Sequence, residues 1–328
     1  MRPPARFASL LATALAALAL AAPATGGAFD LQGHRGARGL APENTLPAFE
    51  RALEIGVTTL ELDVGVTADG AVVVLHDRSL NPALTRDAAG RWLTGPGPAV
   101  RSLTLAQLQA YDVGRINPDS SYGRTFATQQ GQDGVRVPTL AQLFERVTAR
   151  GAGQVRFNIE TKLDPTRPDE TVAPEAMTRA LLQVVERHAM TDRVTIQSFD
   201  WRSLRLVQQL APAIPTACLT VQSAGSDNVR DSAWTAGLQL ADHGSVPALV
   251  RAAGCRSWSP NAGALTAALV QQAHALGLQV LAWTVNAPAD MERLIDWGVD
   301  GIITDYPDRL RAVLDGRGMP LPPSLAPR

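Results

Sequence analysis

Short apolar runs rich in β-branched residues alternate along the chain with longer segments whose apolar residues recur every three or four positions. Such alternation predicts parallel strands with helices packed outside them. About eight strand–helix units in a chain of this length favour a closed (β/α)8 TIM barrel over an open sheet. The strand-like runs are 31–34, 58–64, 72–76, 155–161, 194–198, 216–220, 257–260, 279–285 and 301–305, and the clearest helical patterns are 176–188, 201–210, 264–276 and 288–297.

The first helix of the predicted barrel has recognisable ends. Asn44 or Thr45 is suited to the N-cap, Pro47 fits the first turn, and Gly56 stands where a left-handed terminator is expected. The helix therefore runs between about residues 45 and 56.

One pair of strands breaks the alternation. Residues 61–64 and 73–76 are separated only by a short turn around Asp69-Gly70, and a parallel connection needs a crossover of about a dozen residues or more. The two strands must form an antiparallel hairpin. This pairing places His76 opposite or diagonal to Glu61 and Asp63.

A long irregular section follows the hairpin, from about residue 81 to residue 137. It is rich in Gly, Pro, Ser, Gln and Asp, and we interpret it as an insertion beside the barrel mouth, because loops of that length are usually lids or binding elements. The alternative is a loose surface excursion. The tail from Gly316 onward is expected to be loosely ordered.

Composition and charge narrow the class of protein. The chain has 328 residues, of which 45% are apolar and 19% charged, and its net charge is −1, which is typical of a folded globular protein. A nucleic-acid-binding protein would show a basic excess, which is missing here. Cys218 and Cys255 are too few for a disulfide framework, so they either form one disulfide or stay as two buried thiols.

The N-terminus has the pattern of a secretory signal peptide. Arg2 and Arg6 precede an uncharged, Ala- and Leu-rich stretch at 10–20, and Ala22-Pro23-Ala24 has the small-x-small spacing of a cleavage site. A membrane anchor would need about 20 strongly apolar residues. We therefore expect residues 1–24 to be removed, leaving a single domain at 25–328 that is periplasmic or secreted and has no stable membrane anchor.

Two strand ends carry charged pairs at a spacing of two residues, which places both members of a pair on the same face. Glu61 and Asp63 would repel each other inside a barrel unless a cation intervenes, and a hard divalent ion with oxygen ligands fits this need. Glu160 and Lys162 form the second pair. Lys162 is the single lysine of the chain, beside 29 arginines, which indicates that a compact point charge is required there.

Together the motifs resemble those of the glycerophosphodiester phosphodiesterase family. The resemblance extends in order from about residue 31 to residue 313. It rests on His34-Arg35-Gly36, Pro42-Glu43-Asn44-Thr45, Glu61-Leu62-Asp63-Val64, Asp69-Gly70, His76-Asp77, Glu160-Thr161-Lys162, Ser198-Phe199, Trp283-Thr284-Val285-Asn286 and the run from Gly298 to Pro307.

The resemblance implies a role for each matching position. The metal ligands, for calcium or magnesium, would be Glu61, Asp63 and Glu160, and the acid/base pair would be His34 and His76. Arg35 and Lys162 would be the cations that contact the phosphate. Glu43 would be a carboxylate that lies near both the metal and the glycerol hydroxyls, and Trp283 would form an aromatic wall of the pocket.

The function implied by the resemblance is metal-dependent hydrolysis of small glycerophosphodiesters to sn-glycerol 3-phosphate and an alcohol. Two alternatives are a phospholipase D-like enzyme acting on lysolipids and a non-catalytic barrel that binds phosphodiesters. The former would need an apolar groove or basic rim, and the latter would be expected to lose a histidine or a metal ligand. The sequence does not indicate an oligomeric state or a head-group preference.

Overall fold

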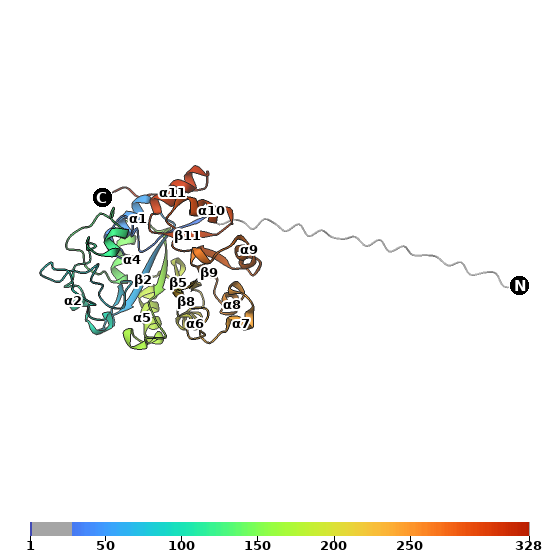
Figure 1. Ribbon diagram of the computed structural model, residues 1–328, viewed down its shortest axis with the longest axis horizontal. Coiled ribbons are helices and arrows are strands. Elements are labelled where there is room, and N and C mark those ends of the chain that lie inside the picture. Colours follow the sequence, from blue (N-terminus) through green and yellow to red (C-terminus); the bar gives the residue numbers. More distant parts are fainter. Residues whose placement is uncertain (2–27, 328) are drawn as a thin grey trace.

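The computed structural model describes residue 1 and residues 28–327, so the predicted signal peptide, apart from Met1, lies outside the described residues (Figure 1). Eight parallel strands close into a barrel because β1 pairs with both β2 and β11. The predicted (β/α)8 barrel is confirmed. Its strands, in barrel order, are β1 Asp30–Gly33, β2 Thr59–Val66, β4 Arg156–Thr161, β5 Val194–Ser198, β6 Thr216–Thr220, β9 Ser257–Pro260, β10 Gln279–Ala282 and β11 Gly301–Thr304.

Helices surround the strands, as Figure 1 shows. None of the helices in the described part of the chain is long and apolar enough to cross a membrane. The main helices are α1 Leu46–Ile55, α4 Leu140–Ala149, α5 Pro174–Arg187, α6 Trp201–Leu210, α8 Val246–Ala252, α9 Ala267–Ala275, α10 Pro288–Asp296 and α11 Pro307–Gly316; the short ones are α2 Leu105–Leu108, α3 Ser121–Thr125 and α7 Leu240–His243.

The barrel interior is polar where it approaches the mouth. Asn158 of β4 donates from Nδ2 to Gln32 of β1 at 2.9 Å and to Gln197 of β5 at 3.0 Å. Gln197 in turn donates to Oε1 of Glu61 at 2.8 Å. A buried carboxylate is costly unless its oxygens are bonded, so this amide network fixes Glu61 in one orientation.

The loop between β1 and α1 is held tightly against the helix. Thr45, one of the two predicted caps, is the N-cap of α1 and accepts from Ala48 N at 3.4 Å, while Asn44 bonds to Asp63 instead. Gly36 has a φ of 86°, and a β-carbon there would lie 2.7 Å from the Ala48 backbone. Only glycine fits this close approach to the helix, which positions the loop residues on either side of Gly36.

The predicted hairpin is confirmed. Strand β3, Val72–Val74, runs antiparallel to β2 with Val64 opposite Val74, and Leu75 N donates to Asp63 O at 3.0 Å. His76 follows directly, and so it reaches the mouth of the barrel beside the carboxylates of β2.

The irregular section at 81–137 has a small core of its own, so it is not a loose surface excursion. Its apolar side chains pack with those of β3, and Gln129 Nε2 donates to Arg38 O at 2.6 Å, which joins the section to the loop after β1. It therefore lies beside the barrel mouth, as predicted. The core consists of Val73, Leu80, Val100, Leu108, Val113, Val135 and Val137.

The prediction of a loosely ordered tail is wrong for the described residues after Gly316. Leu325 N donates to Leu53 O of α1 at 3.0 Å, and Arg150 donates to Ala326 O at 2.6 Å. The tail packs against the barrel because its leucines and Met319 contact the main hydrophobic core.

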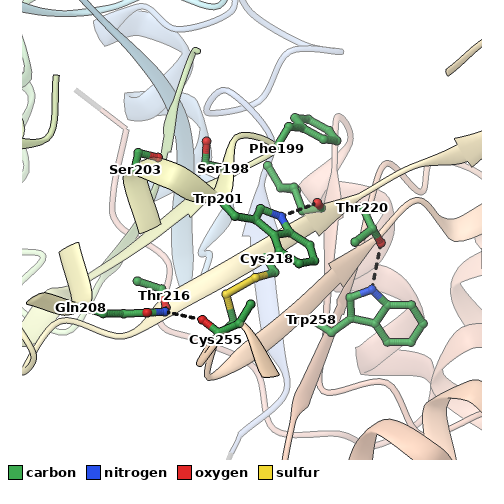
Figure 2. Close-up of a disulfide and its surroundings, with 12 residues drawn as sticks. Ser198, Phe199, Trp201, Ser203, Gln208, Thr216, Cys218, Thr220, Cys255 and Trp258 are labelled. Atoms are coloured by element: carbon green, nitrogen blue, oxygen red, sulfur yellow. Dashed lines mark hydrogen bonds between the residues drawn. A yellow bond between two sulfur atoms is a disulfide. The ribbon is translucent and has the colours of Figure 1, made fainter. Parts of the chain in front are cut away.

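Cys218 of β6 and Cys255, just before β9, form a disulfide (Figure 2), which decides between the two alternatives that the sequence left open. Both half-cystines are buried, with Trp201 and Trp258 beside them. The Trp258 indole donates to Thr220 Oγ1 at 2.8 Å. The bridge links two neighbouring strands of the barrel wall.

Candidate active site

The residues that the sequence singled out converge at the carboxyl ends of the barrel strands. They border or adjoin one cavity of about 260 Å³ at the mouth of the barrel. Side chains from β1, β2, β4 and β10, or from the loops directly after them, meet there because parallel strands all end at the same edge, and His76 reaches the same place from the antiparallel hairpin strand β3. The lining includes His34, Arg35, Glu61, His76, Glu160, Lys162 and Trp283, with Asp63 and Glu43 directly behind Arg35.

Three buried carboxylates form a compact group. Glu61, Asp63 and Glu160 each place an oxygen within 4.8 Å of the others, and Asp63 Oδ1 has no hydrogen-bond partner among the described residues. Burial, followed by the charge of Asp63, raises the pKa of Glu61 well above its usual range. Burial likewise raises the pKa of Glu160 to about 7, although Lys162 opposes this effect. Oxygen donors that repel one another in this way fit a divalent cation.

Two cations flank the carboxylates. Arg35 lies 2.6 Å from Glu43 through Nη1 and 3.3 Å from Asp63 through Nε. Lys162 Nζ lies 2.7 Å from Glu160 and 3.6 Å from Asp63. Burial alone would raise the pKa of Asp63, but these cations and His76 hold it well below its usual range. The two positive groups also line the cavity, where a phosphate can reach them.

An aspartate, Asp305, fixes the orientation of the His34 ring. Its Nδ1 donates to Asp305 Oδ1 at 2.6 Å, and its Nε2 lies 3.9 Å from Glu61 Oε2. Burial and the charge of Arg38 lower the pKa of His34 to about 4, despite the opposing effect of Asp305. The ring therefore offers a free Nε2 for proton exchange at neutral pH.

His76 has the same arrangement with the next residue in the chain. Its Nδ1 donates to Asp77 Oδ1 at 2.9 Å, and Asn81 donates to the second oxygen of Asp77 at 2.8 Å. Burial, Arg35 and Lys162 lower the pKa of His76. Although burial would raise the pKa of Asp77, its bond to His76 lowers it to about 2. Both histidines thus have Nδ1 bonded and Nε2 available.

Trp283 forms part of the cavity wall. Its indole donates to Ser259 O at 2.8 Å, and its ring packs edge-on against Phe199, with centroids 5.4 Å apart. Both rings line the cavity. This part of the cavity wall is therefore aromatic and fixed, and Lys162 Nζ lies 6.0 Å from the centroid of the Phe199 ring.

Several residues of the site received no role from the sequence. Asp305 and Phe199 lie in motifs that were noted, but their partners are remote in sequence. Arg38 donates to both oxygens of Asp305 at 2.7 and 2.9 Å, and its position within the glycine-rich loop between β1 and α1 carries no recognisable signal. Tyr122 lies in the insertion and bonds to Glu43. Nothing in its local sequence predicts this contact.

Comparisons with known proteins point to one family. A family model described as the glycerophosphoryl diester phosphodiesterase family matches residues 34–309. The glycerophosphodiester phosphodiesterase of Caldanaerobacter subterraneus subsp. tengcongensis is 31% identical over 84% of this chain and 94% of its own length. That of Bacillus subtilis is 31% identical over 86% of this chain and 85% of its own length.

Solved structures show the same fold. A crystal structure of a Silicibacter pomeroyi protein named after the same family has a TM-score of 0.80 and 39% identity, covering 91% of this chain and 96% of that one. A phosphodiesterase of Oleispira antarctica, solved with the product sn-glycerol 3-phosphate, has a TM-score of 0.64 and 24% identity, covering 87% and 96% of the two chains.

Proposed function

This chain belongs to the glycerophosphoryl diester phosphodiesterase family, and on that basis we propose which residues carry out its reaction, which ions support it and where it works. The enzyme hydrolyses glycerophosphodiesters, the deacylated forms of phospholipids, to sn-glycerol 3-phosphate and an alcohol. The observation that carries this function is the convergence of three carboxylates, two cations and two histidines on one cavity.

Glu61, Asp63 and Glu160 fit a divalent metal ion, since they supply three buried oxygen donors close together. Calcium and magnesium are the two candidates, because both prefer carboxylate oxygens. When bound, the ion supplies positive charge to the phosphoryl oxygens.

Side chains of the protein bind the phosphate and transfer the protons. Arg35 and Lys162 hold the phosphate and offset the negative charge that grows on its oxygens. One histidine takes a proton at Nε2 from the attacking hydroxyl, which belongs to water or to the glycerol 2-position, and the other gives a proton to the leaving alcohol. Asp305 and Asp77 keep the two rings oriented.

Neither alternative function is favoured by the structure. A lipid-surface enzyme would need exposed apolar side chains, yet within residues 28–327 Leu210 is the single exposed large hydrophobic residue. A non-catalytic binding barrel would be expected to lack a histidine or a carboxylate, and all the expected ones are present.

The export of the protein to the periplasm or the medium is part of the proposal. The signal pattern at residues 1–24 supports it, and so does the disulfide, because disulfides persist mainly in oxidising compartments. Mass measurement of the mature protein after cell fractionation tests this: a chain that begins near residue 25 outside the cytoplasm is expected, and an uncleaved cytoplasmic chain would contradict it.

The test of the function is release of sn-glycerol 3-phosphate from a panel of glycerophosphodiesters, before and after chelation, with calcium or magnesium restored separately. Glu61→Gln, Asp63→Asn and Glu160→Gln should each abolish most of the ion-dependent activity. Glu175→Gln is the matched control, because Glu175 is an exposed residue of α5 whose ion-pair partner among residues 28–327 is Arg179. Full activity after exhaustive chelation would overturn the metal site.

A further inference from the structure

A tyrosine of the insertion at 81–137 joins the charged network of the mouth. Tyr122, in the short helix α3, donates its hydroxyl to Glu43 Oε2 and accepts from Arg38 Nη1 at 3.3 Å. Its ring packs against Phe126, with centroids 5.0 Å apart. The hydroxyl therefore lies between the carboxylate and the guanidinium of two different parts of the loop after β1.

Glu43 is fixed from two sides. Arg35 donates to Oε1 at 2.6 Å, and Tyr122 donates to Oε2. The Glu43 side chain is 7% exposed, and Glu43 and His76 together border a cleft next to the main cavity. Each carboxylate oxygen can accept more than one hydrogen bond, so Glu43 keeps acceptor capacity for a hydroxyl of the substrate.

The insertion is hydrogen-bonded to the loop between β1 and α1 close to Tyr122. Gln129 Nε2 donates to Arg38 O at 2.6 Å, Gln130 N donates to Leu40 O at 2.9 Å, and the Arg38 guanidinium lies 4.8 Å from the Phe126 ring. These contacts fix the tyrosine relative to the β1–α1 loop. A carboxylate that is held in one orientation selects a hydroxylated ligand better than a mobile carboxylate does.

We propose that Tyr122 is a positioning residue that sets the preference for the glycerol moiety by fixing Glu43, so that the insertion acts as part of the substrate site. This proposal rests on the proposed function, in which the glycerol hydroxyls donate to Glu43. It assigns the insertion a role in recognition and leaves the chemical step to the metal ligands and the histidines.

The experiment uses glycerol p-nitrophenyl phosphate as substrate and compares two competitive inhibitors, sn-glycerol 3-phosphate and propyl phosphate, which differ only in the glycerol hydroxyls. Tyr122→Phe should raise the inhibition constant of sn-glycerol 3-phosphate, and the KM of the substrate, about tenfold, as expected for a lost hydrogen bond to a charged group. The inhibition constant of propyl phosphate should change by no more than about twofold, because it makes no such bond. Equal increases in the two inhibition constants would overturn the proposal.

Two further variants make the test specific. Tyr111→Phe removes a hydroxyl from the same insertion that makes no hydrogen bond within the described residues, and it should leave both inhibition constants unchanged. Tyr122→Phe combined with Glu43→Gln should lose no more glycerol preference than Glu43→Gln alone, because the tyrosine acts through that carboxylate. A loss equal to the product of the single losses would overturn the proposal. A wild-type enzyme that releases no glycerol 3-phosphate would instead overturn the proposed function on which it rests.

Discussion

Asp305 follows His34 by 271 positions in the chain, yet its Oδ1 lies 2.6 Å from Nδ1 of that histidine. The closure of the barrel causes this contact, because β1 pairs with β11 in a register that sets Gly33 beside Thr304. The next residue of each strand then emerges at the same edge, where His34 N donates to Thr304 O at 2.8 Å. The aspartate also accepts from Arg38 and Asn286. Burial alone would raise the pKa of Asp305, but His34 and Arg38 hold it well below its usual range.

Asp305→Asn should lower kcat by about 10²-fold with little change in KM, because an amide neither fixes the tautomer of His34 nor balances its charge during proton transfer. Steady-state kinetics on a glycerophosphodiester measures this. Asp300→Asn is the control, since Asp300 bonds His274 at 2.9 Å and lies outside the residues that line the cavity. A kcat near that of the wild type in Asp305→Asn would show that His34 does not depend on the aspartate.

His34→Ala and His76→Ala should each lower kcat by roughly 10²–10⁴-fold, the range for loss of a general acid or base. Substrate affinity should change little because Arg35 and Lys162 still hold the phosphate. With a p-nitrophenyl diester, whose leaving group needs no proton, the variant that lacks the acid should recover most of its rate. The variant that lacks the base should not recover, so the comparison assigns the two roles.

The double variant His34→Ala/His76→Ala should be far less impaired than the product of the two single losses, because both histidines act on one transition state. If both single variants kept a near-normal kcat, the histidines would be structural. A bell-shaped dependence of kcat/KM on pH is expected for the wild type, since one ring must begin protonated and the other neutral.

The two histidines should each lower the stability of the metal-free protein as the pH decreases from 7 to 5, whereas Glu61 and Glu160, whose pKa values are raised, act in the opposite direction. The pKa of His34 is about 4 in the folded chain and 6.5 in the unfolded chain, so in this window the unfolded state binds a proton that the folded state does not. His34 should therefore reduce the free energy of unfolding by about 2 kcal/mol at pH 5 relative to neutral pH. His76, whose pKa is also lowered, adds to the loss in the same direction.

Urea unfolding of the wild type and of His34→Asn in the presence of a chelator, at pH 7 and pH 5, isolates the contribution of His34. On going from pH 7 to pH 5, the free energy of unfolding of His34→Asn should change by about 2 kcal/mol in the stabilising direction relative to that of the wild type, because asparagine does not titrate. An equal change in both proteins would mean that His34 does not contribute to the pH dependence.

Removal of the disulfide should destabilise the protein without direct damage to the site. The bridge joins Cys218 and Cys255 across 37 positions, and a closed loop of that length corresponds to about 3–4 kcal/mol in the chain-entropy account. Cys218→Ser/Cys255→Ser, or the wild type with reductant, should unfold at lower urea concentration. The kcat of the folded protein should stay within about twofold, because neither cysteine lines the cavity. Equal stability with and without reductant would indicate that the bridge does not form.

The sequence predicted the elements of this fold closely where the signal was local. The runs at 194–198, 216–220 and 257–260 match strands β5, β6 and β9 residue for residue, and the helix at 201–210 matches α6. In these segments the side-chain period and the residues that flank it all lie within a few positions of one another. The tail after Gly316 was misjudged because its packing partners on α1 and α4 are remote in sequence.

For the site, the sequence by itself determined which residues carry charge at strand ends: Glu61 with Asp63, Glu160 with Lys162, and His34 with Arg35. For the first two pairs, a spacing of two residues at a strand end fixes the shared face, so this much follows from local geometry. Only the tertiary structure decided that Asp305 supports His34, that the cysteines pair, and that Tyr122 of the insertion bonds Glu43. Each of these contacts depends on barrel closure or on the docking of a long insertion, and the free energy that sets them comes from the packing of the whole chain.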